Sequence, residues 1–387
     1  MPVTSRRPHR FPPKKERRKV LLAQYWWDDR VFRGVAKYAS EHNWALDFKM
    51  RWNTQLPDEW TSGGIIAHTG VANPQQHLID FIQRAVKQFG IPVVETQQQN
   101  IVGSSAVVVP HERIGEIAAE HLLSLDFREI AFVTFAENVL EAQRRSGVKR
   151  AVEAAGAHFY ALEFTTLFEA LKNLPKPLGL VTYFDHSALN TINACTEWGF
   201  RVPEEIAVIG VDDTEIICDL APIPLSSVNC NYEEQGYEAA ALLDRLMDGQ
   251  SASATPIIIQ PRGVTVRRST DTIAIPDLNT SLFLRFLRDH FQETLSLEYI
   301  AEDLGVSLRK IQINFRRYLN RTVIQELTRI RVEHAKKLLE DPELKINTVG
   351  LESGFASRFH FIRAFQRMTG TTPGKYRADF IVKKQST

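Results

Sequence analysis

Short apolar runs alternate with longer amphipathic segments over the first two-thirds of the chain. The runs have the length and β-branched content of buried strands, at residues 20–23, 46–50, 64–67, 91–94, 130–133, 178–182 and 206–211. The segments between them have the 3.6-residue period of helices, at residues 31–42, 78–89, 114–125, 143–155 and 189–198. This alternation predicts a parallel sheet wound with helices on both faces.

The strand–helix pattern breaks at about Val107–Pro110 and then restarts. Two consecutive α/β units predict two lobes with a cleft between them. In open α/β sheets ligands lie at the carboxyl ends of the strands. The side chains that follow the predicted strands are therefore candidates for ligand contact, namely Trp26, Trp27, Asp28, His68, Phe184, Asp185, Asp212 and Asp213.

The last third of the chain has only helical periodicity. In the stretch Ile346–Arg377, Gly354 favours the end of one helix and Ser357 supplies a cap for the next. Phe361 and Phe365 then face inward, and the exposed face carries Arg358, His360 and Arg363. A short helix with a basic outer face after a glycine turn is typical of a helix-turn-helix unit.

A second unit of this kind precedes the first. Within Ser296–Asn320, Ala301, Gly305 and Ser307 repeat the spacing of a small residue, a glycine and a helix cap. A helix over residues 281–291 leads into this unit. A long amphipathic helix connects the two units, with its expected inward residues at Ile324, Leu327, Ala335, Leu338 and Leu339.

Length and charge fit a chain of two or three domains. The 387 residues carry a formal net charge of only +1, but residues 280–387 hold 19 Lys and Arg against 12 Asp and Glu. That segment therefore carries +7 and the remainder −6, as expected for a DNA-binding domain joined to a domain of other function. We expect a disordered basic tail at 1–18, a two-lobed domain at 19–270, a linker at 271–279 and the helical domain at 280–387.

Several function classes are disfavoured. Three cysteines without a CxxC pair indicate reduced thiols, and no apolar run is long enough for a membrane span, so we expect a cytoplasmic protein without membrane contact. A solute-binding transport component would need a secretory signal. The motifs GxSxG, HExxH, GxxxxGK[ST] and GxGxxG do not occur, so we expect neither an enzyme nor a bound metal or cofactor.

The two-lobed region resembles the effector domain of the LacI/GalR family, which has the periplasmic-binding-protein fold. The resemblance rests on GFRVPEEIAVIGVDD at 199–213, PLSSV at 224–228 and AAALLDRLMDG at 239–249, with further matches at 90–94, 118–123 and 144–147. It implies a small sugar or related metabolite as ligand, held by Arg144, Asp185 and Asp212. The chain departs from the family pattern at Phe184, where Asn is common, and at Pro110, where Asp is common.

Aromatic and acidic residues at the end of the first strand suit the same ligand. Sugars are held by carboxylates, by Arg donors and by aromatic faces stacked on C–H surfaces. Trp26 and Trp27, with Asp28, are therefore expected to form a wall of the pocket. Packing of the two Trp rings on the lobe surface is the alternative.

The helical region resembles the DNA-binding domain of the AraC/XylS family, most specifically in its closing signature of Gly354-Phe355, Phe361, Phe365, Gly370, Pro373 and Tyr376-Arg377. The resemblance implies two recognition helices in successive major grooves. Its base-reading candidates are Arg309, Gln312 and Ile313 in the first unit and Arg358, Phe359 and Arg363 in the second. Lys310, Arg316 and Arg317 are expected at phosphates or in solvent, and Ile311 and Phe315 in the core.

This order of domains is similar to that of the regulators of xylose-utilisation genes. The resemblance implies D-xylose or a related sugar as effector, a homodimer formed through the effector domain, a double-stranded DNA operator at the nucleoid, and activation through RNA polymerase. A regulator that answers another sugar, or that represses, is the alternative.

Overall fold

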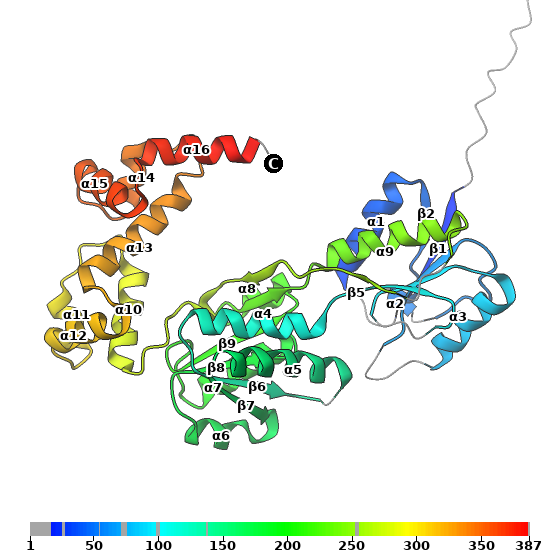
Figure 1. Ribbon diagram of the computed structural model, residues 1–387, viewed down its shortest axis with the longest axis horizontal. Helices are drawn as coiled ribbons and strands as arrows, with labels where there is room; N and C mark the ends of the chain where they lie inside the picture. The colour runs from blue at the N-terminus through cyan, green and yellow to red at the C-terminus, as the bar shows by residue number, and fades with distance from the viewer. Residues whose placement is uncertain are drawn as a thin grey trace, which may run out of the picture.

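A computed structural model describes residues 17–24, 28–53, 55–70, 76–97, 101–136, 138–251 and 255–385. Two α/β lobes lie side by side, and a helical domain lies beyond the second lobe (Figure 1). This arrangement confirms the expected fold class. Residues 1–16 of the predicted basic tail and the pair Trp26 and Trp27 lie outside the described residues. The last residue of that predicted disordered tail, Arg18, is instead the first residue of a strand.

The first lobe is built on a six-stranded parallel sheet in the order β11-β5-β4-β3-β1-β2. Its strands are β1 (Arg18–Gln24), β2 (Trp44–Asp47), β3 (Gly64–His68), β4 (Val93–Glu95), β5 (Ser105–Val108) and β11 (Ile257–Ile258). Helices α1 (Asp29–Glu41) and α9 (Tyr232–Met247) pack on one face, and α2 (Met50–Asn53) and α3 (Gln76–Phe89) on the other. Alternate residues of β1 point to the two cores because strand side chains alternate between faces.

The second lobe repeats this plan with the sheet order β12-β10-β9-β8-β6-β7, in which only β12 is antiparallel among the described pairings. Its strands are β6 (Glu129–Thr134), β7 (His158–Glu163), β8 (Leu178–Thr182), β9 (Ile206–Val211), β10 (Ser226–Asn229) and β12 (Gly263–Thr265). Helices α4 (His111–Ser124) and α5 (Val139–Ala154) cover one face; α6 (Leu167–Asn173), α7 (Asp185–Glu197) and α8 (Glu215–Leu220) cover the other. Short 3₁₀ turns occur at η1 (Phe164–Thr166) and η2 (Arg268–Thr270).

Three segments connect the lobes. The chain passes from β5 to α4, returns from β10 to α9, and crosses again from β11 to β12. Pro110 caps α4 without a side-chain hydrogen bond, and Asn231 precedes α9 with a left-handed φ of 63°. Helix α4 packs in the second lobe although β5, the strand before it, belongs to the first. Helix α9 packs in the first lobe although β10, the strand before it, belongs to the second. Each lobe is therefore built from separate parts of the sequence.

Glycines bring one helix pair in each lobe into backbone contact. A Cβ added at Gly115 of α4 would lie 2.0 Å from the Arg144 carbonyl oxygen, and one at Gly147 of α5 would lie 1.9 Å from that of Glu112. Gly34 and Gly236 do the same for α1 and α9. Helices α5 and α1 are therefore packed in backbone contact with α4 and α9, the helices that the first two crossings enter.

The helical domain contains seven helices within its described residues: α10 (Leu278–His290), α11 (Leu297–Asp303), α12 (Leu308–Leu319), α13 (Val323–Leu338), α14 (Ile346–Glu352), α15 (Arg358–Thr369) and α16 (Pro373–Gln385). One core forms around Phe283, Ile311 and Phe315, and a second around Phe361 and Phe365. Helix α13 contributes to both cores and joins them (Figure 1). The two expected helix-turn-helix units are present.

Three local expectations were wrong. Strand β2 ends at Asp47, and Met50 instead begins α2 with its side chain buried in the first lobe. Ile324, expected inward, is 58% exposed in the first turn of α13. Helix α10 begins at Leu278, inside the expected linker, because the Asp277 side chain accepts a hydrogen bond from Thr280 N. Strands β5, β7 and β10 were not predicted from the apolar pattern.

Candidate ligand pocket and nucleic-acid interface

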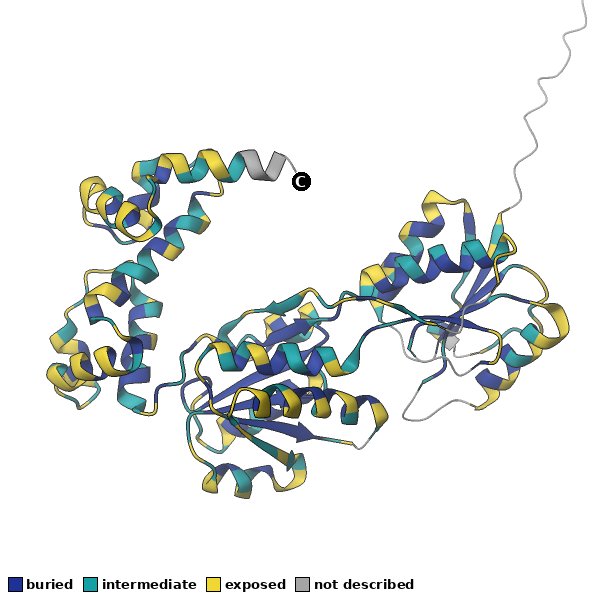
Figure 2. Ribbon diagram, in the orientation of Figure 1, coloured by how far each residue is buried: buried dark blue, intermediate teal, exposed yellow. Residues whose placement is uncertain are grey.

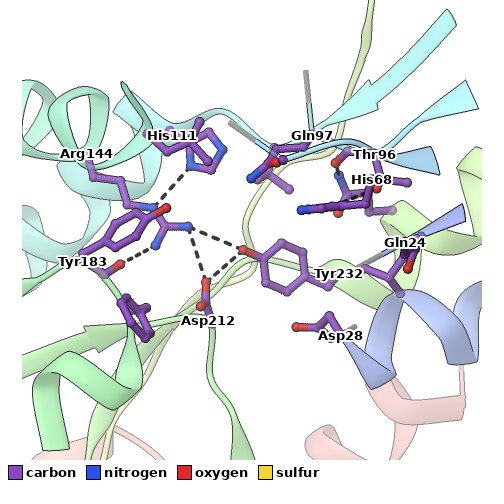
Figure 3. A pocket seen from close by; sticks show the side chains of 16 residues that line it. Gln24, Asp28, His68, Thr96, Gln97, His111, Arg144, Tyr183, Asp212 and Tyr232 are labelled. Atoms are coloured by element: carbon purple, nitrogen blue, oxygen red, sulfur yellow. Dashed lines mark hydrogen bonds and ion pairs between the residues drawn. The ribbon is translucent and has the colours of Figure 1, made fainter. Parts of the chain in front are cut away.

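A cavity of about 410 Å³ lies between the lobes at the carboxyl ends of their strands (Figure 3). That volume suits a small organic ligand. Its walls combine a few apolar side chains with convergent polar groups, at Gln24, Asp28, Val31, His68, Gly70, Thr96, Gln97, Val109, His111, Leu140, Arg144, Tyr183, Phe184, Asp212, Tyr232 and Gln235.

Arg144 organises the polar side of this cavity. It reaches from α5 to Asp212 Oδ1 at 3.4 Å and donates to the carbonyl oxygen of Tyr183, over whose ring its guanidinium lies. Tyr232, from the other lobe, donates to the same Asp212 oxygen at 2.8 Å. The predicted residues Arg144 and Asp212 are thus brought together, with Tyr232 completing the cluster (Figure 3).

The backbone at Asp212 adopts an unusual conformation. Its φ is 104°, and that of Asp213 is 54°, both outside the range that non-glycine residues ordinarily occupy. Such conformations persist where surrounding contacts fix them, and they concentrate at functional sites. Here Arg30 of α1 donates to the Asp212 carbonyl oxygen, and Asp212 N donates to Val228 O at 3.0 Å.

Burial sets the charge states in the cavity. Burial lowers the pKa of Arg144, but Asp212 together with the neighbouring Tyr232, Cys230 and Tyr183 more than offsets this, so the net shift is upward and the guanidinium stays charged. Burial, reinforced by Arg144, lowers the pKa of His111 to about 3. His111 is therefore neutral, and because its Nδ1 faces Arg144 Nε at 3.3 Å, its Nε2 carries the proton.

The first lobe contributes neutral hydrogen-bonding groups. His68 Nδ1 lies 3.4 Å from Thr96 Oγ1, and burial lowers the pKa of His68 to about 4. Gln235 Nε2 donates to the carbonyl oxygens of Thr96 and Val107. The Oε1 atom of Gln97 is buried with no hydrogen-bond partner among the described residues. A buried acceptor without a partner is costly unless a ligand or water supplies one.

The charged side chains around the cavity are paired. Asp28 binds Arg30 at 2.6 Å, and Arg30 also lies over the ring of Tyr232. Asp212 binds Arg144, as described above. Each carboxylate is therefore balanced by one guanidinium, and the wall presents hydrogen-bonding groups without a surplus of either sign.

Asp185 lies beside the cavity and does not line it. Its carboxylate accepts hydrogen bonds from Thr214 N and from the Ser227 hydroxyl, and the side chain is buried. Burial, with the neighbouring Asp212 charge, raises the pKa of Asp185 to about 7. It lines instead a second cavity of about 660 Å³, which shares Asp28, Phe184, Asp212 and Tyr232 with the first.

Sequence reasoning missed several wall residues. Tyr183 follows directly on β8 and could have been found by the rule that directed attention to strand ends. Tyr232, Gln235 and His111 come from helices that begin at the crossings, and their approach to the cavity depends on the folded path of the chain. Trp26 and Trp27 belong to residues that the structure does not describe.

The helical domain presents its predicted DNA-reading residues to solvent. Each recognition helix begins at a serine whose hydroxyl accepts from the backbone, Ser307 for α12 and Ser357 for α15. Both helices carry exposed outer faces (Figure 2). These faces include all six predicted base-reading side chains: Arg309, Gln312, Ile313, Arg358, Phe359 and Arg363.

Other charged residues of this domain have structural partners. Lys310, expected at a phosphate or in solvent, binds Asp277 at 2.8 Å. Glu326 is buried between Arg321 and Arg329. Ile311 and Phe315 lie in the core as expected, and Ile313 is 56% exposed. The outward positions of α12 and α15 are therefore available to a ligand, while the paired charges hold the domain together.

Comparison with protein families matches both parts of the chain. A family profile described as a periplasmic binding protein-like domain matches residues 119–270, and one described as a helix-turn-helix domain matches residues 300–379. The xylose operon regulatory protein of Escherichia coli (strain K12) is 26% identical over 94% of this chain and 97% of its own length. The chain is a two-domain transcription regulator.

Other relatives agree with this architecture. The xylose operon regulatory protein of Haemophilus influenzae is 26% identical over 91% of this chain and 95% of its own length. A solved structure of the xylose-binding transcription activator xylR superposes with a TM-score of 0.68 at 22% identity, covering 94% of this chain and 98% of that one. The relatives are regulators, so the expectation that the chain is not an enzyme is confirmed.

Among the described residues, no helix is long and apolar enough to cross a membrane. Within the same residues, no group of three His, Cys, Asp or Glu side chains is arranged to hold a metal ion.

Proposed function

We propose that this regulator binds a neutral monosaccharide, D-xylose, in the cavity between its lobes and activates transcription of genes for xylose use. Arg144 and Asp212 would bind hydroxyl groups, with Asp28, Gln97 and His111 as further partners. The full-length relatives in Escherichia coli and Haemophilus influenzae, both named for the xylose operon, support this choice of sugar.

The pairing of charges in the cavity carries the proposal for a neutral ligand. A sugar phosphate or sugar acid needs cations that are not already neutralised, whereas Arg144 and Arg30 each face a carboxylate. A neutral polyol needs closely spaced hydrogen-bond donors and acceptors. The Gln amides, His imidazoles and Tyr phenols that line the cavity supply them. The unpartnered Gln97 Oε1 is an acceptor suited to a sugar hydroxyl.

The output of the protein would be sequence-specific binding to double-stranded DNA. Arg309 and Gln312 of α12, and Arg358 and Arg363 of α15, would contact base edges, since Arg reads guanine and Gln reads adenine. We further propose a homodimer formed through the effector domain at residues 19–270, contact with RNA polymerase, and a site of action in the cytoplasm at the nucleoid. Asp185 would support the pocket indirectly, through its hydrogen bonds to Thr214 N and the Ser227 hydroxyl.

Calorimetric titration of the full chain with pentoses and hexoses tests the ligand. D-Xylose should bind at least tenfold more tightly than D-ribose, L-arabinose or D-glucose. Asp212→Asn should weaken D-xylose binding by at least tenfold, since a carboxylate hydrogen bond contributes about 1.5–3 kcal/mol. Asp219→Asn, a change at a carboxylate whose side chain is 60% exposed, is the matched control.

The same titration separates the alternatives. Tighter binding of another sugar would replace D-xylose as effector, and a heat-silent response to every sugar would contradict the proposal. Selection of operator DNA from a random library, followed by transcription in vitro with and without D-xylose, distinguishes activation from repression.

A further inference from the structure

Ion pairs attach the helical domain to the second lobe. Turn η2, just before it, is buried in that lobe, where the Ser269 hydroxyl donates to Val208 O at 2.6 Å. The first residue of this turn, Arg268, binds the Asp289 carboxylate of α10 through two hydrogen bonds of 2.6 and 2.7 Å. Arg285 of α10 reaches the buried Glu204 carboxylate at 3.1 Å. Movement of the second lobe at η2 would therefore displace α10.

The residue before η2 connects this attachment to the end of β9. Arg267 Nη1 binds Asp213 Oδ1 at 2.8 Å, and both side chains are largely buried, at 14% and 10% exposure. Arg267 also binds Asp219 at 2.6 Å, a carboxylate that is 60% exposed. A buried ion pair depends strongly on geometry, because either charge left unpaired carries a large desolvation cost.

Asp213 directly follows the cavity residue Asp212. The Asp212 side chain faces the cavity, whereas the Asp213 carboxylate accepts from Thr265 Oγ1 at 2.6 Å and Asn229 Nδ2 at 3.0 Å as well as from Arg267. Both residues have positive φ, so the peptide between them has little freedom to absorb a displacement. A ligand that pulls on Asp212 would shift Asp213 with it.

We propose that Asp213 and Arg267 are the positioning residues that transmit sugar binding to the DNA-binding domain. The connection runs from Asp212 to Asp213, across the ion pair to Arg267, along the chain to Arg268, and across the second ion pair to Asp289 of α10. It rests on the proposed function, because it assumes a sugar at Asp212.

The proposed coupling between the cavity and α10 requires that a contact between them change when the sugar binds. A ligand shifts a distant site only if the contacts between the sites differ in the two states. The Asp213–Arg267 pair is the contact that would differ. Among the ion pairs of the described residues, it alone joins the neighbour of the cavity residue Asp212 to the neighbour of Arg268, which holds α10. Its loss should leave each site intact and uncouple them.

Hydrogen exchange of the full chain with and without saturating D-xylose tests this. In the wild type, D-xylose should change the exchange rates of amides in α10 (Leu278–His290) by at least fivefold. In Asp213→Asn and in Arg267→Gln, that change should shrink to less than twofold. Calorimetry should show the D-xylose Kd of both variants within about threefold of the wild type.

Asp219→Asn is the matched control, because it removes the other carboxylate partner of Arg267 and leaves the Asp213 pair in place. It should keep the wild-type response in α10. Undiminished responses in both Asp213→Asn and Arg267→Gln would overturn the proposal, as would a response lost equally in Asp219→Asn. If Asp213→Asn weakens sugar binding itself, Arg267→Gln decides, since Arg267 lies away from the cavity.

The outcomes separate this inference from the proposed function. A wild-type chain that binds no D-xylose by calorimetry contradicts the proposed effector. A wild-type chain that binds D-xylose without any change in α10 contradicts the coupling alone.

Discussion

Asp185 shows how one buried residue can make the stability of a lobe depend on pH. Its carboxyl is buried against α8 and β10, next to Asp212, and burial raises its pKa to about 7. In the unfolded chain an Asp titrates near pH ~4. The folded state therefore favours the protonated form, so its stabilising contribution is complete below about pH 4 and is lost as the pH rises through about 7.

Asp185→Asn should remove this dependence. Between pH 5 and pH 8 the wild type should lose about 2 kcal/mol of unfolding free energy that the variant keeps. Exchange of an acceptor oxygen for an amide at Thr214 N adds a cost that does not vary with pH, so the slope and not the offset is diagnostic. Urea unfolding at both pH values measures it, and parallel profiles for wild type and variant would refute the assignment.

Tyr232 illustrates what the sequence could not reveal at this scale. Its hydroxyl donates to Asp212 from the other lobe, and burial together with the Asp212 charge raises its pKa far above the ordinary value, so it remains a neutral donor. Asp212 was found because it follows a predicted strand and matches a family motif, and Arg144 was found because it matches such a motif. Tyr232 lies outside that motif, and its position depends on the crossing between β10 and α9.

The substitution Tyr232→Phe tests the contribution of that hydroxyl to stability and to sugar binding. Loss of one hydrogen bond to a buried carboxylate costs about 1–3 kcal/mol, and the remaining Arg144 contact is longer. We expect a lower urea midpoint and D-xylose binding that is weakened less than by Asp212→Asn. Tyr237→Phe, which removes an exposed hydrogen bond to Glu41, is the control and should change the midpoint little.

At the scale of elements, the helix pairs α4/α5 and α1/α9 depend on glycine. In Gly147→Ala the new Cβ would lie 1.9 Å from the Glu112 carbonyl oxygen, so the two helices must separate. Overpacking of this kind costs about 1–3 kcal/mol, and we expect a thermal midpoint lowered by several degrees. Gly374→Ala in α16, where a Cβ meets nothing within 4 Å, should be neutral or slightly stabilising.

The same scale shows what the hydrophobic pattern can predict. Most strands and helices of both lobes were placed because buried strands and amphipathic helices leave clear periods. Strand β7 lies at the edge of its sheet with only exposed and half-buried residues, and its short run Phe159–Leu162 was not recognised as a strand; β10 is the polar run Ser226–Asn229 and gave no apolar signal. Ile324 shows the opposite error, since an apolar residue near a helix start need not face the core.

Substitutions in the second recognition helix should affect DNA binding without affecting sugar binding. Arg358→Gln and Arg363→Gln should each weaken binding to a selected operator by about 1–3 kcal/mol and relax base preference at one position. D-Xylose affinity should not change, because α15 is remote from the cavity. Lys336→Gln, which removes one positive charge from α13 where it pairs with Glu333, should alter operator affinity much less. Gel-shift titration and calorimetry provide both readings.

At the scale of the whole molecule, α13 fixes the distance between the two DNA-reading helices. Both helix-turn-helix units pack on this one helix, so they should meet two major grooves about 34 Å apart on one face of the duplex. Insertion of five base pairs between the half-sites should abolish binding by both units. Insertion of ten should not restore it within one protomer, because α13 cannot lengthen. Footprinting of the altered operators would reveal any flexibility.

The reciprocal glycine contacts also matter for building biosensors from this chain. Directed evolution of sugar preference would vary the side chains that face the cleft, and α1 and α5 carry several of them. Because these helices touch α9 and α4 through backbone atoms at Gly34, Gly236, Gly115 and Gly147, within one turn of cavity residues such as Val31 and Arg144, mutagenesis libraries should hold those four positions constant. Selectivity could then be changed while the helix pairs of both lobes keep their packing.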